Sequence, residues 1–392
     1  MNAILKKYLH LILLGMVSFL LTCTGLVKLD IPSNAFKDEQ NWLTVFGSQQ
    51  RHNSVQRDVS PPYQILWDKK IRSVITDQPL AVQDFLIYTL LSGVLGITDS
   101  KTGAKIGDGG IAPGILHAPE ISKNILYYTA NLGDKTLGAL DLNAMKHVWE
   151  KKLPQLNTSP LIYNKQLFVG GNNGTFYCVD ASDGDDKWKF ESGDAIYSIP
   201  ARSGDRIISG NIAGLCFALN TSSGSVLWKT QLEGNIYGGP LIADDKVFIG
   251  TTAGILYALD LNDGAVLWQF TSGGSVYGNP SYFEENIYFG NNNHKVFSLN
   301  ADTGTVQWQF VTKGIVNSAP LAAPEFLYVG SWDKSFYVLT RDTGELVYRQ
   351  EFDKPIKASP LIYKGRIYIQ TANNRVFCLQ TESLAGSEGE LP

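Results

Sequence analysis

One slot in the sequence repeats side chains that could bind a ligand. Tyr197, Tyr237 and Tyr277 stand forty residues apart, and small residues such as Gly238 and Gly278 follow them. The same slot in other repeats holds Asn157, Asn317 and Lys357. A tyrosine combines an apolar ring with a hydroxyl, a combination common at recognition surfaces. We therefore expect this slot to be a candidate binding rim for a peptide or a sugar; alternatively, the tyrosines only cap the core at that face.

A second candidate contact is Trp332, which lies in the short segment GSWDK. The corresponding segments of other repeats read GGNNG, GNIAG, GTTAG, GNNNH and QTANN. Variation at one loop position of a rigid scaffold is typical of binding surfaces. Trp332 is therefore expected to contact a partner if it is exposed, and otherwise to pack against the neighbouring repeat.

No residue pattern typical of catalysis or of a metal site is evident. The five histidines lack metal-ligand spacing, and the acidic segment around Asp183 lacks the order and the closing Glu of a calcium loop. Cys178, Cys216 and Cys378 fit small buried fillers better than a disulfide framework. The sequence thus predicts no catalytic residue, no metal and no cofactor. The net charge of −4, without a basic stripe, also argues against a nucleic-acid partner.

The elements that position these residues follow from a repeat of about forty residues. Eight prolines mark the repeat: Pro79, Pro119, Pro160, Pro200, Pro240, Pro280, Pro320 and Pro360. The unit that starts at Pro240 contains four short runs rich in β-branched and aromatic residues, namely Leu241–Ala243, Lys246–Ile249, Ile255–Leu259 and Ala265–Phe270. We therefore predict an all-β fold, an eight-bladed β-propeller of four-stranded antiparallel blades closed by an N-terminal strand.

A large aromatic residue recurs in the fourth strand and is expected to be a buried packing device between blades. The tryptophans of this slot are Trp67, Trp149, Trp188, Trp228, Trp268 and Trp308, with Tyr348 in the same place and Gly107 in the first blade. Trp67 precedes the first anchor proline, whereas the last repeat ends after its third strand. Gln64–Ile71 should therefore pair beside Val376–Leu379 and close the ring.

Several segments resemble a known repeat. ALDLNDGAVLW, ALNTSSGSVLW and SLNADTGTVQW are similar to the Ala-x-Asp-x-x-Thr-Gly-x-x-x-Trp pattern of the PQQ-type β-propeller repeat, and the resemblance extends over roughly Pro79 to Leu379. NWLTVFGSQQRHNS is similar to the Trp…Phe-Gly…Arg-x-Asn lead-in of many exported propellers of this type.

The resemblance implies the fold but not one function, because the family includes quinone-dependent dehydrogenases and outer-membrane assembly lipoproteins. The dehydrogenases also need adjacent cysteines, a calcium site and an Asp base, and this sequence has no Cys-Cys pair. The assembly lipoproteins engage a barrel protein through arginine-bearing loops of the middle blades, and that motif has no recognisable counterpart here.

The N-terminal 27 residues predict export. Lys6 and Lys7 precede an uncharged apolar stretch, which is typical of a secretory signal or a membrane anchor. Cys23 follows Leu-Leu-Thr in a pattern that resembles a bacterial lipobox, so it is a candidate lipidation site. We interpret residues 28–62 as a tether and lead-in, residues 63–381 as the propeller, and residues 382–392 as a loose tail.

These observations favour an exported, membrane-tethered and non-catalytic scaffold. We expect it to bind envelope proteins at the periplasmic, outer-membrane or cell surface, with outer-membrane protein assembly as the leading role. Its membrane contact would be the N-terminal lipid or helix. A quinone-dependent dehydrogenase-like enzyme and a carbohydrate-binding surface module remain the alternatives, since a fold alone does not determine a ligand.

Overall fold

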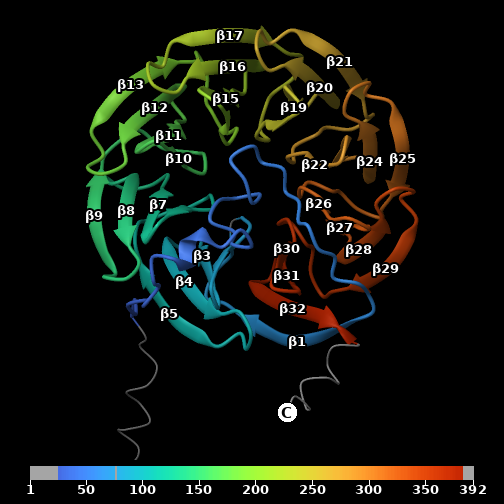
Figure 1. Cartoon of the computed structure of the whole chain (residues 1–392), viewed down its shortest axis with the longest axis horizontal. Coiled ribbons are helices and arrows are strands. Elements are labelled where there is room, and N and C mark those ends of the chain that lie inside the picture. The colour runs from blue at the N-terminus through green and yellow to red at the C-terminus, as the bar shows by residue number, and fades with distance from the viewer. Residues whose placement is uncertain (1–24, 76, 383–392) are drawn as a thin grey trace, which may run out of the picture.

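The computed structural model describes residues 25–75 and 77–382. In this part of the chain, eight four-stranded antiparallel sheets stand as blades around a central axis (Figure 1). The prediction of an eight-bladed propeller is confirmed. The one helical element among the described residues is the short 3-10 helix η1 (Ala35–Lys37), which precedes the ring.

Seven blades run from the axis outward in chain order, and in the closing blade β30, β31 and β32 are followed outward by β1. The innermost strands are β2 (Leu80–Val82), β6 (Glu120–Ser122), β10 (Leu161–Tyr163), β14 (Ala201–Ser203), β18 (Leu241–Ala243), β22 (Ser281–Phe283), β26 (Leu321–Ala322) and β30 (Leu361–Tyr363). The second strands are β3 (Phe85–Thr89), β7 (Ile125–Thr129), β11 (Gln166–Gly170), β15 (Arg206–Gly210), β19 (Lys246–Gly250), β23 (Asn286–Gly290), β27 (Phe326–Gly330) and β31 (Arg366–Thr371).

The outer half of each blade carries the tryptophan slot. The third strands are β4 (Val94–Asp99), β8 (Leu137–Asp141), β12 (Thr175–Asp180), β16 (Leu215–Asn220), β20 (Ile255–Asp260), β24 (Lys295–Asn300), β28 (Ser335–Thr340) and β32 (Arg375–Thr381). The outermost strands are β5 (Lys105–Gly110), β9 (Lys146–Lys151), β13 (Asp186–Glu191), β17 (Val226–Gln231), β21 (Val266–Thr271), β25 (Val306–Val311), β29 (Leu346–Glu351) and β1 (Tyr63–Lys70).

Six slot tryptophans each join one blade to the next. Trp228 Nε1 donates to the carbonyl of Leu261, which lies in the following blade, at 3.0 Å. Equivalent bonds of 2.7–3.2 Å join Trp67 to Ser100, Trp149 to Ala181, Trp188 to Thr221, Trp268 to Ala301 and Trp308 to Arg341. The indole also covers a glycine in the next blade's hairpin, since a Cβ at Gly264 would lie 2.6 Å from Trp228.

Burial of this slot is less uniform than predicted. Trp67, Trp228 and Trp308 are buried, whereas Trp149, Trp188 and Trp268 are half-buried. The outermost strand has a neighbouring strand on its inner side only. An indole there is therefore covered by the hairpin of the next blade but is not enclosed. The packing role is confirmed: Trp188 and Trp268 are less deeply buried than Trp228 and Trp308, but both pack against core clusters.

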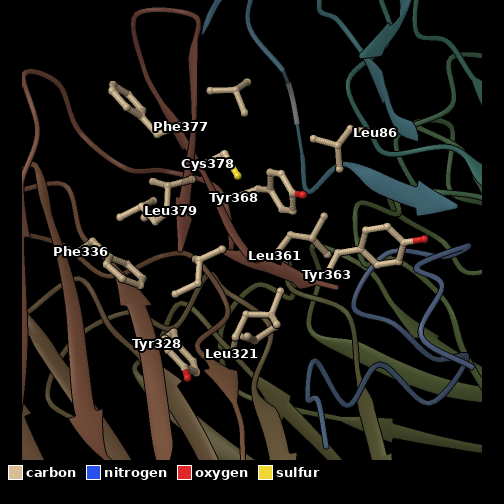
Figure 2. Close-up of a cluster of buried hydrophobic side chains, with 14 of the residues drawn as sticks. Leu86, Leu321, Tyr328, Phe336, Leu361, Tyr363, Tyr368, Phe377, Cys378 and Leu379 are labelled. Carbon is tan, nitrogen blue, oxygen red and sulfur yellow. The ribbon is translucent and has the colours of Figure 1, made fainter. Parts of the chain in front are cut away.

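The ring closes as predicted through β1 and β32. Trp67 pairs with Cys378 and Lys69 with Val376 in an antiparallel ladder. The closing blade then packs on both neighbours: Figure 2 shows Tyr368 and Leu361 of this blade among Leu321 and Tyr328 of the preceding blade, with Leu86 of the first blade nearby. Because the sheet takes its strands from both ends of the described chain, the ring has no gap between its first and last blades.

The first blade departs from the pattern because the chain before the ring fills its tryptophan slot. Gly107 and Gly109 stand in the outermost strand β5, and a Cβ at either position would contact residues 25–27. Leu29 and Ile31 continue from there into the core between the first two blades. The segment read as a tether is therefore packed against the ring from residue 25 onward.

Beyond this point, the lead-in crosses the centre of the ring (Figure 1). Its carbonyls accept the amide hydrogen of the second residue of an innermost strand in six blades: Trp42 from Ala81, Leu43 from Ile121, Gln49 from Arg202, Gln50 from Ile242, His52 from Tyr282 and Asn53 from Ala322. In the third blade, Glu120 Oε1 accepts the equivalent amide of Ile162 at 3.1 Å. The lead-in thus satisfies backbone groups of the innermost strands along the channel.

Candidate binding site at the channel mouth

The three predicted tyrosines lie side by side in consecutive blades. The ring centroids of Tyr197 and Tyr237 are 5.6 Å apart, and those of Tyr237 and Tyr277 are 5.4 Å apart. Tyr237 and Tyr277 each expose 37 % of their surface, and Tyr197 is half-buried. The Tyr197 hydroxyl donates to Asn172 Oδ1 at 3.1 Å. A continuous, partly exposed aromatic row therefore lines one sector of the rim.

Small residues behind the tyrosines set their position. A Cβ at Gly278 would lie 2.4 Å from the carbonyl oxygen of Asn317, and one at Gly238 would lie 3.0 Å from that of Gly278. Asn279 further ties the blades together, because it donates to the Gly239 carbonyl and accepts the Gly239 amide. The backbone segments that carry these residues in neighbouring blades therefore pack closely against one another around the axis.

A cavity of about 230 Å³ opens inside this rim. Asn317 and Lys357 line it together with the three tyrosines, and Phe46 of the lead-in contributes to its lining. Asp77 and His117 also reach it. Residues of the lead-in and residues of the repeats thus line the same cavity.

Two predicted site residues behave differently. Asn157 is buried, because its segment joins the second strand of its own blade: the Asn157 amide donates to the Gly170 carbonyl at 3.1 Å. Asn157 does not line the cavity, so its assignment to the rim is wrong. Trp332 also lies outside the cavity, but it is 37 % exposed and the Lys357 ammonium stands 4.3 Å from its ring centroid. Trp332 thereby extends the rim outward through a cation–π contact.

A buried polar cluster lies at the junction between lead-in and ring, and sequence reasoning missed it. Arg51 is fully buried and donates to the carbonyls of Pro200 and Val45 and to Thr44 Oγ1. Thr44 in turn donates to Glu120 Oε2 at 2.9 Å. The signal for this cluster was the Arg-x-Asn end of the lead-in pattern, because Asn53 also bonds the Pro320 carbonyl at 2.6 Å.

Burial governs the ionisation of these groups. It raises the pKa of Glu120 to about 7, although Arg51 and the bonds from Ile162 and Thr44 act in the opposite direction. Burial likewise raises the pKa of Asp77 to about 6, again opposed by nearby backbone amides and Arg51. It lowers the pKa of Arg51 and brings that of His117 to about 4. Near neutral pH the axis therefore contains one guanidinium, the Asp77 carboxylate, a Glu120 side chain close to its own pKa and a neutral imidazole.

The residues at the mouth do not fit a quinone with its calcium ion. The described part of the chain contains no group of three or more His, Cys, Asp or Glu side chains placed to hold a metal. Cys178, Cys216 and Cys378 are buried singly in third strands, and burial raises the pKa of each thiol to about 12. The cavity is also smaller than the roughly 300–1,000 Å³ typical of small-molecule sites.

The fold and the repeats together define the class of this protein: an eight-bladed β-propeller of PQQ-type repeats. The family model described as outer membrane protein assembly factor BamB matches residues 91–196, 188–314 and 303–385. These overlapping matches cover more than half of the chain. The chain belongs to this family.

Individual relatives agree with this assignment, but at low sequence identity. BamB from Marinobacter adhaerens is 26 % identical over 140 residues, which are 35 % of this chain and 34 % of that protein. The match thus spans about a third of the relative's length. The crystal structure of BamB from Moraxella catarrhalis has a TM-score of 0.70 at 19 % identity, over 82 % of this chain and 98 % of that one.

The same fold occurs in enzymes. Quinohemoprotein alcohol dehydrogenase from Comamonas testosteroni has a TM-score of 0.76 at 11 % identity, over 93 % of this chain and 84 % of that one. At this identity the likeness concerns the fold alone.

Cys23 lies outside the described residues, and among those described no helix is long and apolar enough to cross a membrane.

Proposed function

We propose that this protein is an exported, membrane-tethered and non-catalytic scaffold that holds an envelope protein at the mouth of its channel. Membership of the BamB family supports a scaffold role in outer-membrane protein assembly. The apolar N-terminal stretch and Cys23 support attachment to a membrane through a lipid or a helix. The observation that carries the binding proposal is the partly exposed row of Tyr197, Tyr237 and Tyr277.

The tyrosine row suits an extended polypeptide for two reasons. Tyrosine rings supply contact area with only two rotatable side-chain bonds, so little conformational freedom is lost on binding. Their spacing of 5.4–5.6 Å also gives consecutive side chains of a partner a regular set of aromatic faces and hydroxyls. Trp332 and Lys357 continue the surface at the far end of the row.

The test is capture of partners from detergent-solubilised envelope by the tagged full chain. The triple variant Tyr197→Ala, Tyr237→Ala and Tyr277→Ala should lose capture while its thermal unfolding temperature changes little. A matched control replaces Val226, Val266 and Val306 by Ala, since these residues are about equally exposed on the outermost strands of the same three blades.

Retained capture by the tyrosine variant, together with a large fall in thermal stability, would show that the row belongs to the core and would refute the proposal. Equal loss of capture in the valine control would also refute it. A glycan-binding screen on the wild-type chain completes the test, because binding of a sugar that the tyrosine variant loses would reassign the rim to carbohydrate.

A further inference from the structure

The cavity at the mouth is rich in groups that attract a positive charge. Three tyrosines line it, and so does Asp77. Asn317 Oδ1 is buried and accepts no hydrogen bond from the residues that the structure describes. Aromatic faces, a carboxylate and a free amide oxygen are together the surroundings that an ammonium or guanidinium group prefers.

The charge balance of the axis points the same way. Arg51 is the cation of the buried cluster, and Asp77 and Glu120 are its two carboxylates. Among these three groups one negative charge is left over when both carboxylates are ionised. Lys357 also lines the cavity, but its side chain is exposed and its ammonium lies over the Trp332 ring at the edge of the rim.

The size of the cavity limits what can enter. About 230 Å³ corresponds to roughly seven or eight water molecules in the liquid. This volume suits one long side chain better than a whole cofactor. The lead-in bonds the innermost strands, and its Phe46 lines the cavity together with the three tyrosines of the rim.

We propose that the cavity receives a single lysine or arginine side chain of the bound polypeptide, with the tyrosine rings around its stem and Asp77 and Asn317 bonding its cationic head. This inference rests on the proposed function, because it names the chemistry by which the same rim recognises its partner. It makes one basic residue the anchor of the interaction, and the tyrosines its positioning surface.

Short peptides test the proposal directly. The probes are acetyl-Gly-Xaa-Gly-amide with Arg, Lys, norleucine or Glu at the central position, titrated calorimetrically into the full chain in detergent at pH 7.5. The Arg and Lys peptides should bind, and the norleucine and Glu peptides should not. Asp77→Asn should weaken binding of the Arg peptide by about tenfold or more, since it removes one charge-assisted bond.

The matched control is Asp353→Asn, which removes the same charge from an exposed position in the loop leading to Lys357. It should change the affinity less than twofold. A second pair covers the case in which Asp77→Asn fails to fold: Tyr237→Phe keeps the ring and should keep binding, whereas Tyr237→Leu should lose most of it. Circular dichroism of each variant reports its folding.

Three outcomes would overturn the inference: equal binding of the norleucine peptide, preference for the Glu peptide that Lys357→Gln abolishes, or no binding of any peptide at 10 mM. Its failure is distinct from failure of the scaffold proposal. If the tyrosine variant loses partner capture while the Arg peptide does not bind, the scaffold proposal stands and only the basic anchor is refuted.

Discussion

The contact between Trp228 and Gly264 offers a stringent test of how the blades are joined. Gly264 adopts a φ of +74°, and a Cβ built there would lie 2.6 Å from Trp228 Cδ2 and Cε3. Gly365 adopts nearly the same backbone conformation, with a φ of +70°, but a Cβ there meets nothing within 4 Å. A Cβ at Gly264 would also lie 2.7 Å from Thr230 Oγ1, the end of a small side chain. Alanine substitution at the two positions therefore differs in the contacts with the indole and with Thr230, and not in backbone conformation.

The two substitutions should differ measurably in the free energy of unfolding. A left-handed conformation costs an L-residue about 1–2 kcal/mol, and this cost applies to both. Only Gly264→Ala must also displace the Trp228 ring, and overpacking of this kind costs about 1–3 kcal/mol. The ring cannot move freely, because its Nε1 is bonded to the Leu261 carbonyl. We expect a loss of about 2–5 kcal/mol for Gly264→Ala and about 1–2 kcal/mol for Gly365→Ala.

Urea unfolding followed by tryptophan fluorescence and circular dichroism measures both losses. The double variant Trp228→Ala with Gly264→Ala supplies the coupling energy, because the Gly264→Ala cost should fall toward that of Gly365→Ala once the indole is gone and only the contact with Thr230 Oγ1 is left. Equal losses for the two single glycine variants, or a Gly264→Ala cost that persists without the indole, would refute the interblade lock.

Three further predictions concern the lead-in and the N-terminus. Burial raises the pKa of Glu120 from 4.5 to about 7, so its contribution to stability is fully present below pH 4.5 and is lost as the pH rises to about 7. Glu120→Gln should therefore remove roughly 3 kcal/mol of the pH dependence of the unfolding free energy measured in urea titrations. An unchanged slope of the unfolding free energy against pH between pH 4.5 and 8 would contradict this prediction. Arg51→Met should destabilise the fold by about 3–5 kcal/mol, because it leaves two carbonyls without their donor and removes the positive charge near Glu120. The exposed Arg57→Met should be nearly neutral, and similar effects of the two would show that the cluster does not hold the lead-in. Cys23→Ser should leave an unprocessed precursor that takes up no labelled fatty acid, and unchanged processing with unchanged membrane attachment would instead favour an uncleaved anchor.

The blade architecture could be read from the sequence because its signals are local. Short alternating strands, glycine hairpins and the tryptophan slot recur at one period, and each is decided by residues within a few positions of one another. Counting the slots also predicted the closing pair of β1 and β32, since Trp67 had no other repeat to belong to. The alignment of Tyr197, Tyr237 and Tyr277 followed from the same period and the rotational symmetry of a ring.

Only the tertiary structure decided the path of the lead-in and which repeat positions reach the cavity at the mouth. The lead-in docks through backbone carbonyls such as those of Gln50 and Asn53, and backbone groups are identical in every residue, so no side-chain pattern announces their partners. The same reason explains Asn157: its position in the repeat matched the rim, but a local bond to Gly170 withdrew it from the surface. Local propensities repeat with the sequence, whereas contacts across more than a hundred residues depend on how the closed ring fits around the chain that enters it.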